Sequence, residues 1–532
     1  MKKKVLFISI LSFVFFIILL SDTIIPAGNV SGNWILSDSP FLIEGEITIP
    51  DGESLIIEPG VLVEFQGHYK FNVQGRLLAI GTEQDSIYFT INDTTGFSNH
   101  TIPDGGWHGI RFDNTPTTND SSKIIYCKLE YGKALGSNPD YLGGAIYCCA
   151  LYSGFSKILI INSKIINNYA GCGGGIALKF SSVILRNNYI SHNISGYYGG
   201  GIYCRNSYLN SGSYIESNTI SHNFATQEGG GICGQRLKVS NSLIHSNSAE
   251  YGGGIYSEGN SNIINCTLSE NTAQMKGGAL FCTDSEMSEV KNCILWNNNA
   301  FEEGNEIALL AYWYAIPWNF VFVPANIDLR YNNIEEGYDG ISLYFEGSTP
   351  QFPITYNILY YYNLDSDPLF INPENGNFRF FSDSPCINTG TPDTIGLNLP
   401  EYDLDGNQRI YDGRIDMGCY EWQGTGTENY ELQISNFKLN NYPNPFNPTT
   451  TIKFSLTGNT EDAELEIYNI KGQKIKTLEC NNHVIAEATE SLHHITWYGR
   501  DENNQPVSSG IYLYQLNINN KSVSIKKMML IK

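Results

Sequence analysis

Two aspartates of an Asp-x-Asp-Gly sequence, Asp403 and Asp405, have the residue type and spacing of calcium ligands. Such a sequence forms the first half of a calcium-binding loop, but the bidentate glutamate that completes the loop is missing here. Arg409 and Arg414 follow closely, so turns held by Asp–Arg pairs are the alternative. The segment therefore predicts either a calcium site at Asp403 and Asp405 or a set of structural turns.

Aromatic side chains gather in two insertions, residues 312–322 and 344–362. Long loops on a rigid scaffold often contain binding residues, and aromatic rings beside carboxylates offer a flat apolar surface to a sugar ring. The alternative is that the rings pack the insertions onto the rest of the fold. The candidate ligand-binding residues are Trp313, Tyr314, Trp318, Tyr344 and Tyr356.

His192 and His222 occupy the same place in two Ser-His-Asn segments, whereas His245 is displaced by one position. We expect the first two imidazoles to be neighbours, either as a general base or metal ligand or as a solvated turn. The solvated turn is the favoured interpretation. The sequence contains no G-x-S-x-G, phosphate-binding loop or HExxH motif, and it assigns no catalytic residue.

The elements that must position these side chains repeat along the chain. A Gly-Gly-Gly-Ile sequence or a close variant occurs six times between residues 143 and 280. A second motif, which ends in asparagine, lies between the copies of the first. Because the two motifs recur together at a spacing of about 25 residues, they predict one structural unit stacked many times. The second motif ends at Asn168, Asn193, Asn223, Asn247, Asn271 and Asn298.

Each repeat contains short β-prone runs between polar, glycine-rich turns, and none has helical periodicity. We expect three short strands in each turn of a right-handed parallel β-helix, with the asparagines stacked at a corner and glycines where no Cβ fits. The fold class is therefore all-β, a solenoid followed by a small Ig-like antiparallel β-sandwich. The aliphatic residues expected to point inward are Ile165, Ile190, Ile220, Ile244, Leu268 and Leu295.

The net charge of −22 is unevenly distributed. Residues 141–300 contain nine Lys/Arg and eight Asp/Glu, whereas residues 301–421 contain four Arg and nineteen Asp/Glu. Nothing here would neutralise phosphates, so a nucleic-acid partner is excluded. A polyanionic sugar would also be repelled unless divalent cations bridged it.

The cysteines fall largely at equivalent positions of successive repeats, as Cys148, Cys204 and Cys282 do. This spacing favours buried thiols stacked inside the solenoid over disulfides. Cys386 and Cys419 are the exception, because they bracket the terminal segment and could form a bridge that closes it.

A basic start followed by an apolar run from Val5 to Leu20 predicts a secretory signal peptide, with an uncleaved membrane anchor as the alternative. Composition then divides the remaining chain. The expected parts are a signal peptide at 1–27, a cap and first coils at 28–130, the repeats at 131–300, terminal coils with the aromatic insertions and an acidic end at 301–422, a linker at 423–431 and a C-terminal domain at 432–532.

Three stretches resemble known families. The stacked repeats resemble pectate-lyase-like β-helix proteins, and Ser384–Glu421 resembles the choice-of-anchor segment of surface β-helix proteins. The sequence NYPNPFNP from Asn441, with Thr450–Phe454 and Ser508–Tyr512, resembles the type A C-terminal sorting domain of the type IX secretion system. This resemblance implies a Gram-negative bacterium, recognition by the outer-membrane secretion machinery, and delivery to the outer cell surface.

Two function classes remain open. The first is a non-catalytic surface protein that binds an extracellular glycan or acts as an adhesin. The second is a secreted polysaccharide lyase or glycoside hydrolase, which would need acidic groups that converge in a groove midway along the helix. The sequence favours binding, because its middle section has few carboxylates per coil.

Overall fold

The computed structural model describes residues 22–531 except 120, 151–156, 206–211, 284–285, 317–318, 347–355, 398, 425–439, 443–445, 457–462, 470–472, 480–490 and 519–520. The chain forms two compact units. One comprises residues up to Ile371 together with Phe378–Gln423, and the other comprises Gly424–Lys532 together with Asn372–Asn377.

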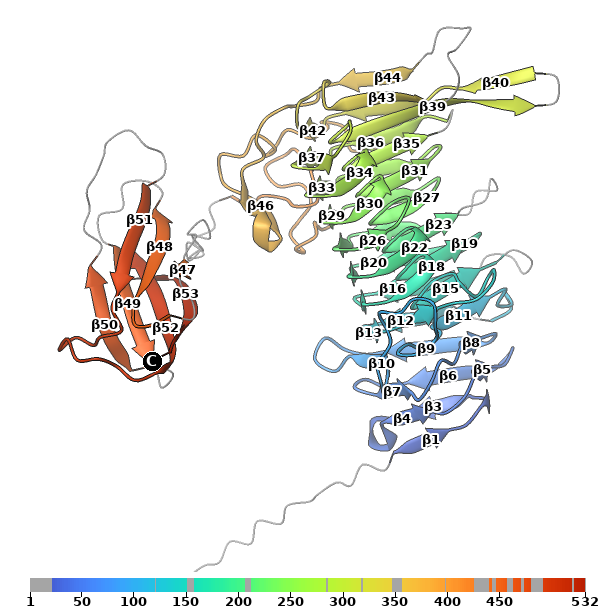
Figure 1. Cartoon of the computed structure of the whole chain (residues 1–532). Coiled ribbons are helices and arrows are strands. Elements are labelled where there is room, and N and C mark those ends of the chain that lie inside the picture. Colours follow the sequence, from blue (N-terminus) through green and yellow to red (C-terminus); the bar gives the residue numbers. More distant parts are fainter. Residues whose placement is uncertain are drawn as a thin grey trace, which may run out of the picture. The chain divides into compact units, whose positions relative to one another are not determined.

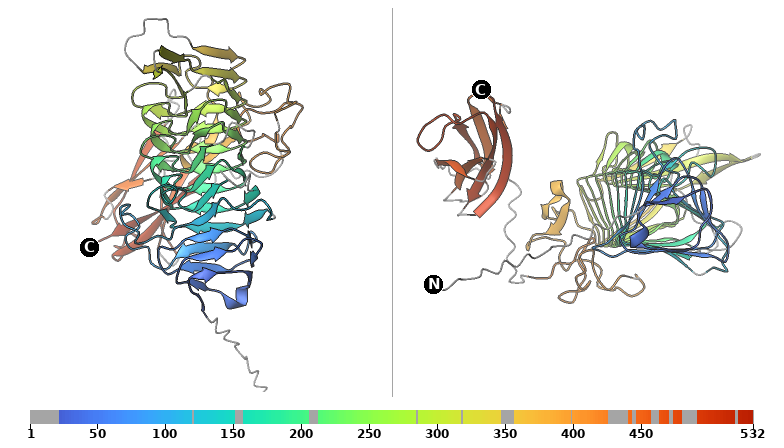
Figure 2. Two further views of the ribbon diagram at one scale, coloured as in Figure 1. Left: turned by 90° about the vertical axis from the view of Figure 1, so that its right-hand side faces the viewer. Right: turned by 90° about the horizontal axis from the view of Figure 1, so that it is seen from below.

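The first unit is a right-handed parallel β-helix in which successive strands enter different sheets and each strand pairs with its equivalent one coil away (Figures 1 and 2). We name the sheets A, B, C and D. Sheet A runs in the order β1 (Thr23–Ile25), β4 (Phe41–Ile43), β7 (Leu62–Phe65), β10 (Ile87–Ile91), β13 (Cys127–Glu130), β17 (Lys164–Ile166), β21 (Tyr189–Ser191), β25 (Thr219–Ser221), β29 (Leu243–His245), β33 (Thr267–Ser269), β37 (Ile294–Trp296) and β42 (Asn333–Ile334).

Sheets B and C follow the same path along the axis. Sheet B contains β2 (Gly28–Asn29), β5 (Ile47–Ile49), β8 (Phe71–Val73), β11 (Ile110–Asp113), β15 (Ile146–Cys149), β19 (Ile176–Lys179), β23 (Ile202–Arg205), β27 (Ile232–Gln235), β31 (Ile255–Glu258), β35 (Leu280–Thr283), β39 (Ile307–Ile316), β40 (Asn319–Val323) and β43 (Ile341–Glu346). Sheet C contains β3 (Gly32–Trp34), β6 (Ser54–Ile57), β9 (Arg76–Ile80), β12 (Ser122–Ile125), β16 (Lys157–Ile161), β20 (Ser182–Arg186), β24 (Tyr214–Glu216), β28 (Lys238–Ser240), β32 (Asn262–Ile264), β36 (Ser288–Lys291), β41 (Asn326–Arg330) and β44 (Asn357–Tyr361).

Sheet D differs from the expectation of three strands per coil. In the repeat region a fourth short strand lies between sheet A and sheet B, and these strands pair in parallel. Most of their residues are alanine, glycine or polar, so they lack the β-prone signature of the other strands. Sheet D contains β14 (Lys133–Ala134), β18 (Tyr169–Cys172), β22 (Ile194–Tyr198), β26 (Phe224–Ala225), β30 (Ser248–Tyr251), β34 (Thr272–Lys276) and β38 (Asn299–Ala300).

The predicted register of the repeats is confirmed. Ile176 pairs with Ile202, and Ile202 pairs with Ile232, in one line along sheet B. All three side chains are buried, as are the aliphatic residues expected to point inward from sheet A. The core is therefore a continuous stack of aliphatic layers.

Inside the solenoid the asparagines form the expected ladder. The Asn193 side-chain Nδ2 donates to Asn223 Oδ1 at 3.0 Å, and Asn223 Nδ2 donates to Asn247 Oδ1 at 2.9 Å. The ladder ends at Glu306, whose carboxylate accepts from the backbone N–H and the Nδ2 of Asn298. Burial raises the pKa of Glu306 to about 8.

A second polar ladder, not foreseen from the sequence, runs along the corner between sheets C and A. Asn188 Nδ2 donates to Asn218 Oδ1 at 3.0 Å, and the Asn218 backbone N–H donates to Ser242 Oγ at 3.1 Å. Farther along, Cys266 N donates to Cys293 Sγ, and Cys293 N donates to Asn332 Oδ1. Mixed Asn, Ser and Cys at one position hide this ladder in the sequence.

The glycine triplets form the corner before sheet B. Gly199 has a φ of 64°, which a residue with a side chain rarely adopts. A Cβ on Gly200 would lie 2.3 Å from the Gly230 carbonyl oxygen of the next coil. The triplet therefore combines a left-handed turn with a close approach of two backbones.

The eleven described cysteines are unbridged and buried, and this set includes Cys386 and Cys419. The expectation of stacked thiols is confirmed at Cys266 and Cys293, whereas the suggested bridge between Cys386 and Cys419 does not form in this structure. Both of these thiols lie in one apolar cluster with Leu243 and Ile294 of sheet A. Packing of the terminal segment on the solenoid therefore replaces the disulfide.

The terminal segment also contains η2 (Pro373–Asn375), β45 (Phe370–Asn372) and β46 (Asn377–Phe380), and η1 (Leu36–Asp38) lies in the first coil. The solenoid begins at Thr23, where β1 pairs with β4, so its first coil starts inside the range 1–27 that the sequence assigned to a signal peptide. Cleavage at Asp22 or before it would keep this coil intact. Within the described part of the chain, no helix is long and apolar enough to span a membrane.

The second unit has two antiparallel sheets around a core that contains Trp497, Tyr512 and Leu516. It is the small antiparallel β domain that alternation along its strands predicts. Its strands are β47 (Asn440–Tyr442), β48 (Thr450–Leu456), β49 (Ala463–Asn469), β50 (Lys474–Glu479), β51 (Ser491–Trp497), β52 (Gly510–Ile518) and β53 (Lys521–Leu530).

Candidate functional site

Side chains that point outward from sheets B and D form columns along the solenoid axis. Because alternate residues of a strand point to opposite sides, Ile202 and Cys204 are buried while Tyr203 and Arg205 face outward. Pairing between coils aligns Tyr203 with Cys233, Tyr256 and Phe281, and the residue before each glycine pair forms a second column. The second column is Leu142, Cys172, Tyr198, Glu228, Tyr251, Lys276 and Glu303.

Aromatic rings of these columns contact one another. The rings of Tyr198 and Tyr203 lie 6.3 Å apart, and those of Tyr256 and Phe281 lie 5.2 Å apart with an interplanar angle of 8°. Tyr251 meets Phe281 edge-on at 5.4 Å. Tyr198, Tyr203 and Tyr251 remain partly exposed, so this outer surface, which we call the BD face, presents rings to solvent.

Two cavities on the BD face share Tyr198. The larger one, of about 560 Å³, lies toward the N-terminal coils and includes Tyr141, Tyr169 and Tyr197. The smaller one, of about 200 Å³, is lined by Tyr198, Tyr203, Cys204, Arg205, Glu228, Cys233, Gly234, Gln235 and Glu258. The two cavities therefore follow one another along this face, and rings and a few charged groups line them.

Glu228 and Glu258 bring two carboxylates into the smaller cavity. Burial, and secondly the negative charge of Glu258, raise the pKa of Glu228 to about 7. Glu228 is also hydrogen-bonded to Tyr256 and Cys233, and Gln235 Nε2 donates to the Glu258 carboxylate. The middle of the solenoid thus holds a half-buried carboxyl group that is partly protonated at neutral pH.

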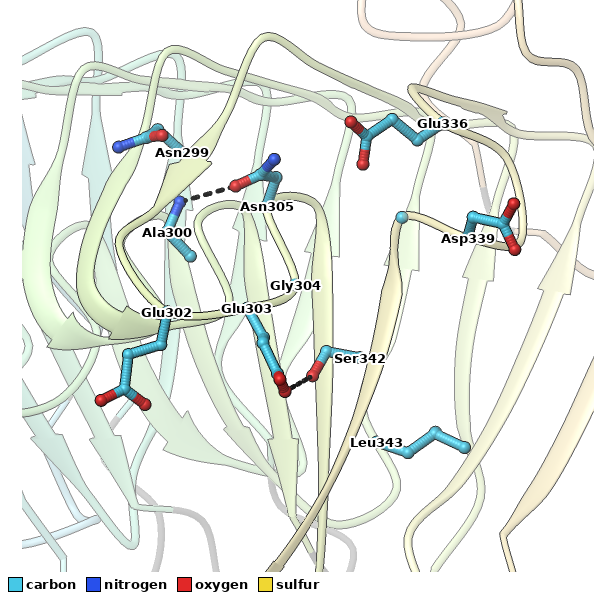
Figure 3. Close-up of a pocket in the computed structure, with 11 residues that line it drawn as sticks. Asn299, Ala300, Glu302, Glu303, Gly304, Asn305, Glu336, Asp339, Ser342 and Leu343 are labelled. Atoms are coloured by element: carbon cyan, nitrogen blue, oxygen red, sulfur yellow. Dashed lines mark hydrogen bonds between the residues drawn. The ribbon is translucent and has the colours of Figure 1, made fainter.

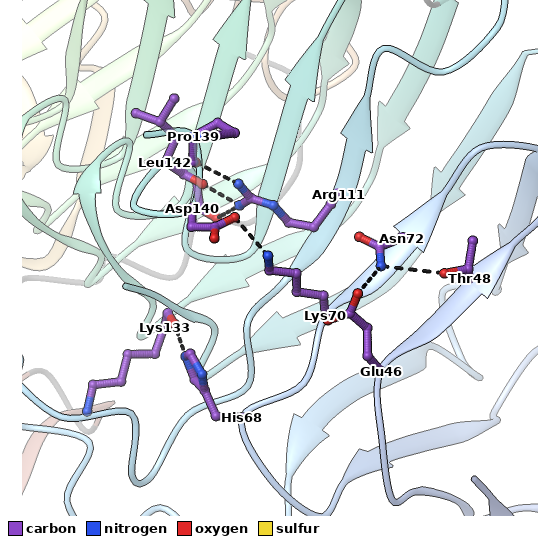
Figure 4. Close-up of polar contacts among 11 residues, drawn as sticks. Glu46, Thr48, His68, Lys70, Asn72, Arg111, Lys133, Pro139, Asp140 and Leu142 are labelled. Atoms are coloured by element: carbon purple, nitrogen blue, oxygen red, sulfur yellow. Dashed lines mark hydrogen bonds and ion pairs between the residues drawn. The ribbon is translucent and has the colours of Figure 1, made fainter. Parts of the chain in front are cut away.

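Polar contacts of the N-terminal coils extend this side of the solenoid (Figure 4). Lys70 Nζ pairs with Asp140 at 2.8 Å, and the buried Arg111 guanidinium donates to the carbonyls of Pro139 and Leu142 and stacks on the Tyr147 ring. Because its nitrogens bind backbone carbonyls, Arg111 fixes the 139–143 loop beside the larger cavity.

An acidic cavity of about 580 Å³ lies at the C-terminal end of the columns, and Glu302, Glu303, Glu336 and Asp339 line it (Figure 3). Lys276 lies 3.2 Å from Glu302 and 3.4 Å from Glu303, and Ser342 donates to Glu303. Among the described residues, no group of three or more His, Cys, Asp or Glu side chains is placed to hold a metal ion.

The aromatic residues predicted to bind ligand are distributed as follows. Trp313 and Tyr314 belong to β39, where they pair with Phe322 and Val321 of β40, but their side chains, like the whole of Trp318, lie outside the described residues. The Tyr344 ring lies 4.8 Å from Lys276 Nζ, at the C-terminal end of the BD face. Tyr356 packs against the end of the core and donates to the Tyr344 carbonyl, as the packing alternative expects.

Asp403 and Asp405 form hydrogen bonds and an ion pair with the protein itself. Asp403 accepts from the backbone N–H groups of Asp405, Asn407 and Glu421, and Asp405 pairs with Arg379. This is the arrangement that the alternative of structural turns describes. Calcium at Asp403 and Asp405 stays a prediction.

The histidines lie as their register predicts. The rings of His192 and His222 stack at 5.0 Å with an interplanar angle of 3°, and both residues adopt a left-handed backbone at the corner. His245 falls one position away, packs on Phe378, and burial lowers its pKa to about 4. His192 and His222 are both exposed, and Ser191 Oγ lies 2.7 Å from His192 Nδ1, as the solvated-turn interpretation expects.

The second unit can be assigned by comparison with known families. Its sequence over residues 440–532 matches the family described as "Secretion system C-terminal sorting domain". Residues 440–532 are a secretion sorting domain. The protein is therefore a secreted β-helix that the type IX system delivers to the outer surface of a Gram-negative bacterium.

Other parts of this chain match known proteins over short stretches. Residues 265–283 match the Chlamydia polymorphic membrane protein repeat. A segment of 99 residues is 33% identical to Protein bark beetle of Drosophila melanogaster, which is 18% of this chain and 3% of the fly protein.

Two solved structures are also similar. The periplasmic alginate epimerase AlgG shares 13% identity over 61% of this chain and 77% of that chain, with a TM-score of 0.30. PorZ, a surface component of the type IX secretion system of Porphyromonas gingivalis, shares 22% identity over 20% of this chain and 13% of that chain, with a TM-score of 0.14.

Sequence reasoning missed the BD face because it treated the repeats only as scaffold. The signal was present in the repeat itself. Once the isoleucine of Gly-Gly-Gly-Ile points inward, the residue after it and the residue before the glycines must point outward. Tyr203, Tyr256 and Glu228 occupy those positions.

Proposed function

We propose that this protein is a cell-surface polysaccharide-binding solenoid whose ligand lies along the BD face. The observation that supports this proposal is the column of Tyr203, Cys233, Tyr256 and Phe281, in which three of the four side chains are rings, and which lies beside two cavities that share Tyr198 as a lining residue. Strands in adjacent coils lie about 4.8 Å apart, so the column is a regular surface for a chain-like ligand. Surface delivery by the sorting domain brings this face to extracellular glycans.

The charges of the BD face favour a neutral glycan. The smaller cavity contains two carboxylates and one guanidinium, and the C-terminal cavity adds four more carboxylates. A polyanion would be repelled there unless cations bridged it. An adhesive role follows if the same glycan belongs to another cell or to a matrix.

Binding is tested with Tyr203→Ala in the full chain, using laminarin, xylan, galactomannan and starch as probes. Loss of a stacked ring should weaken binding by about 1–3 kcal/mol, by analogy with bases stacked on aromatic side chains. Titration calorimetry measures the affinity, and thermal melting checks that the variant is folded. Tyr214→Ala removes an exposed ring from sheet C and serves as the matched control.

Equal losses in both variants, or none in either, would place the ligand elsewhere. The aromatic insertions are then the next candidate. Trp313→Ala and Trp318→Ala should each weaken the binding free energy by about 1–3 kcal/mol if their rings stack on sugar. If both variants bind normally and melt earlier, these rings pack the insertions instead.

A further inference from the structure

We propose that the smaller cavity of the BD face is a catalytic centre that hydrolyses the bound polysaccharide, with Glu228 as the proton donor and Glu258 as the base that activates water. The inference rests on the proposed glycan binding, and it adds a reaction to it. The substrate class is a neutral polysaccharide, because the two carboxylates that line the cavity would repel a polyanion and Arg205 is the one cation among its described lining residues.

The two carboxylates are held by different rigid elements. Glu228 lies at the corner just before Gly229 and is bridged to Tyr198 and Tyr251 of the neighbouring coils. Glu258 is the last residue of β31 and pairs with Gln235 of β27. Both line one cavity in which Arg205 is the nearby cation, so a bound sugar would meet both groups at once.

Their surroundings differ in a way that separates the two roles. Glu228 is half-buried against Tyr256 and Cys233, and its pKa of about 7 leaves a large protonated fraction at neutral pH. A hydrogen bond from Tyr256 stabilises the carboxylate that remains after the proton has been given away. Glu258 accepts a hydrogen bond from the Gln235 amide, which fixes its orientation. Two carboxyl groups with unlike surroundings are the arrangement of a glycosidase.

The reaction consumes one water for each linkage. Glu228 gives its proton to the glycosidic oxygen, and the bond from that oxygen to the anomeric carbon breaks with its electron pair leaving on the oxygen. Water adds to the anomeric carbon as its proton passes to Glu258. A proton then returns from Glu258 to Glu228 through solvent, and a new reducing end has formed.

Hydrolysis is tested on the full chain with the four neutral polysaccharides named above, by release of reducing ends. Glu228→Gln and Glu258→Gln should each lower the rate about 10²–10⁴-fold, the usual contribution of a general acid or base, while binding measured by calorimetry is retained. Glu216→Gln, on sheet C where it pairs with Arg186, is the matched control and should keep the wild-type rate.

The pH profile gives a second readout. Activity of the wild-type protein should fall as pH rises through about 7, because Glu228 then loses the proton that it must donate. Glu258→Gln should keep an alkaline limb in its residual activity but move it to lower pH, because the charge that helps to raise the pKa of Glu228 is gone, and Glu228→Gln should abolish the limb.

The outcomes separate the two proposals. Binding without release of reducing ends overturns hydrolysis and leaves glycan binding in place, whereas absence of binding to every probe contradicts the proposed function itself. Products with unsaturated ends would show elimination and also overturn the hydrolytic role. Glu228→Gln activity equal to wild type would remove Glu228 from the reaction.

Discussion

At the scale of single residues, the asparagine ladder shows how a buried polar group can hold a fold together. Asn223 accepts from the backbone N–H and the Nδ2 of Asn193, and it donates to Asn247 Oδ1 and to the Ile190 carbonyl. The side chain is buried. Burying an amide costs little free energy when all of its hydrogen bonds are made. Removing the amide leaves each of its partners without a hydrogen bond.

Asn223→Ala should therefore lower the free energy of unfolding by about 3 kcal/mol or more, because several buried donors and acceptors lose their partner together. Urea denaturation followed by circular dichroism measures the change. Gln274→Ala removes an exposed amide from sheet D and should change stability by less than about 0.5 kcal/mol. A small effect at Asn223 would mean that water replaces the missing amide.

The sequence predicted single residues well wherever they repeat. The inward isoleucines, the asparagines and the His192–His222 stack were placed by counting positions. Glu228 and Glu258 were not found, because the neighbouring coils have other residue types at these two positions, so neither glutamate belongs to a repeating motif. Their roles depend on burial and on each other, which only the stacked structure supplies.

At the scale of elements, the corner between sheets D and B depends on glycine for two separate reasons. Gly199 needs a left-handed backbone, whereas Gly200 has no room for a side chain. Periodicity predicted strands and corners of the other three sheets. It missed sheet D, whose short strands are set by pairing with neighbouring coils and not by their own composition.

Gly200→Ala should destabilise the solenoid by more than about 2 kcal/mol, because the new Cβ would meet the Gly230 carbonyl oxygen at 2.3 Å. Gly396→Ala is the comparison, since its backbone is left-handed at a φ of 83° but the space around it is open. That control isolates the backbone strain, of about 1–2 kcal/mol. Thermal and urea melts of both variants would show whether close approach costs more than strain.

The terminal segment should make stability depend on pH. Burial, and then the charge of Asp416, raise the pKa of Glu421 to about 8, while burial raises that of Asp416 to about 6. Arg409 and Asp403 face the same cluster. The folded chain therefore keeps protons that the unfolded chain has already lost.

The contribution of this cluster to stability should consequently be greatest at acid pH and fall as pH rises from about 5 to about 8, because its carboxyl groups ionise more easily in the unfolded state over this range. Glu421→Gln should flatten part of this slope, and Glu401→Gln, at an exposed position, should not. Melting temperatures across the range test the expectation. A stability that rises with pH would show that these carboxyl groups are ionised in the fold.

At the scale of the whole molecule, we expect the two units to have separate tasks, since residues 440–532 are the sorting domain and the proposed binding face belongs to the solenoid. A chain that lacks residues 432–532 should fold its β-helix and remain behind the outer membrane. Cell fractionation and protease digestion of intact cells measure this. Arrival of the truncated chain at the surface would show that the solenoid contains its own export signal.

The asparagine ladder gives the solenoid an electrical direction. In every rung from Asn168 to Asn298 the side-chain amide donates toward the following coil, so the amide dipoles add along the axis instead of cancelling. Their positive end meets the carboxyl group of Glu306, whose oxygens accept from the backbone N–H and the Nδ2 of Asn298. Insertion of one whole coil would lengthen this array and leave the groups at its two ends in place, because each coil contacts only its neighbours.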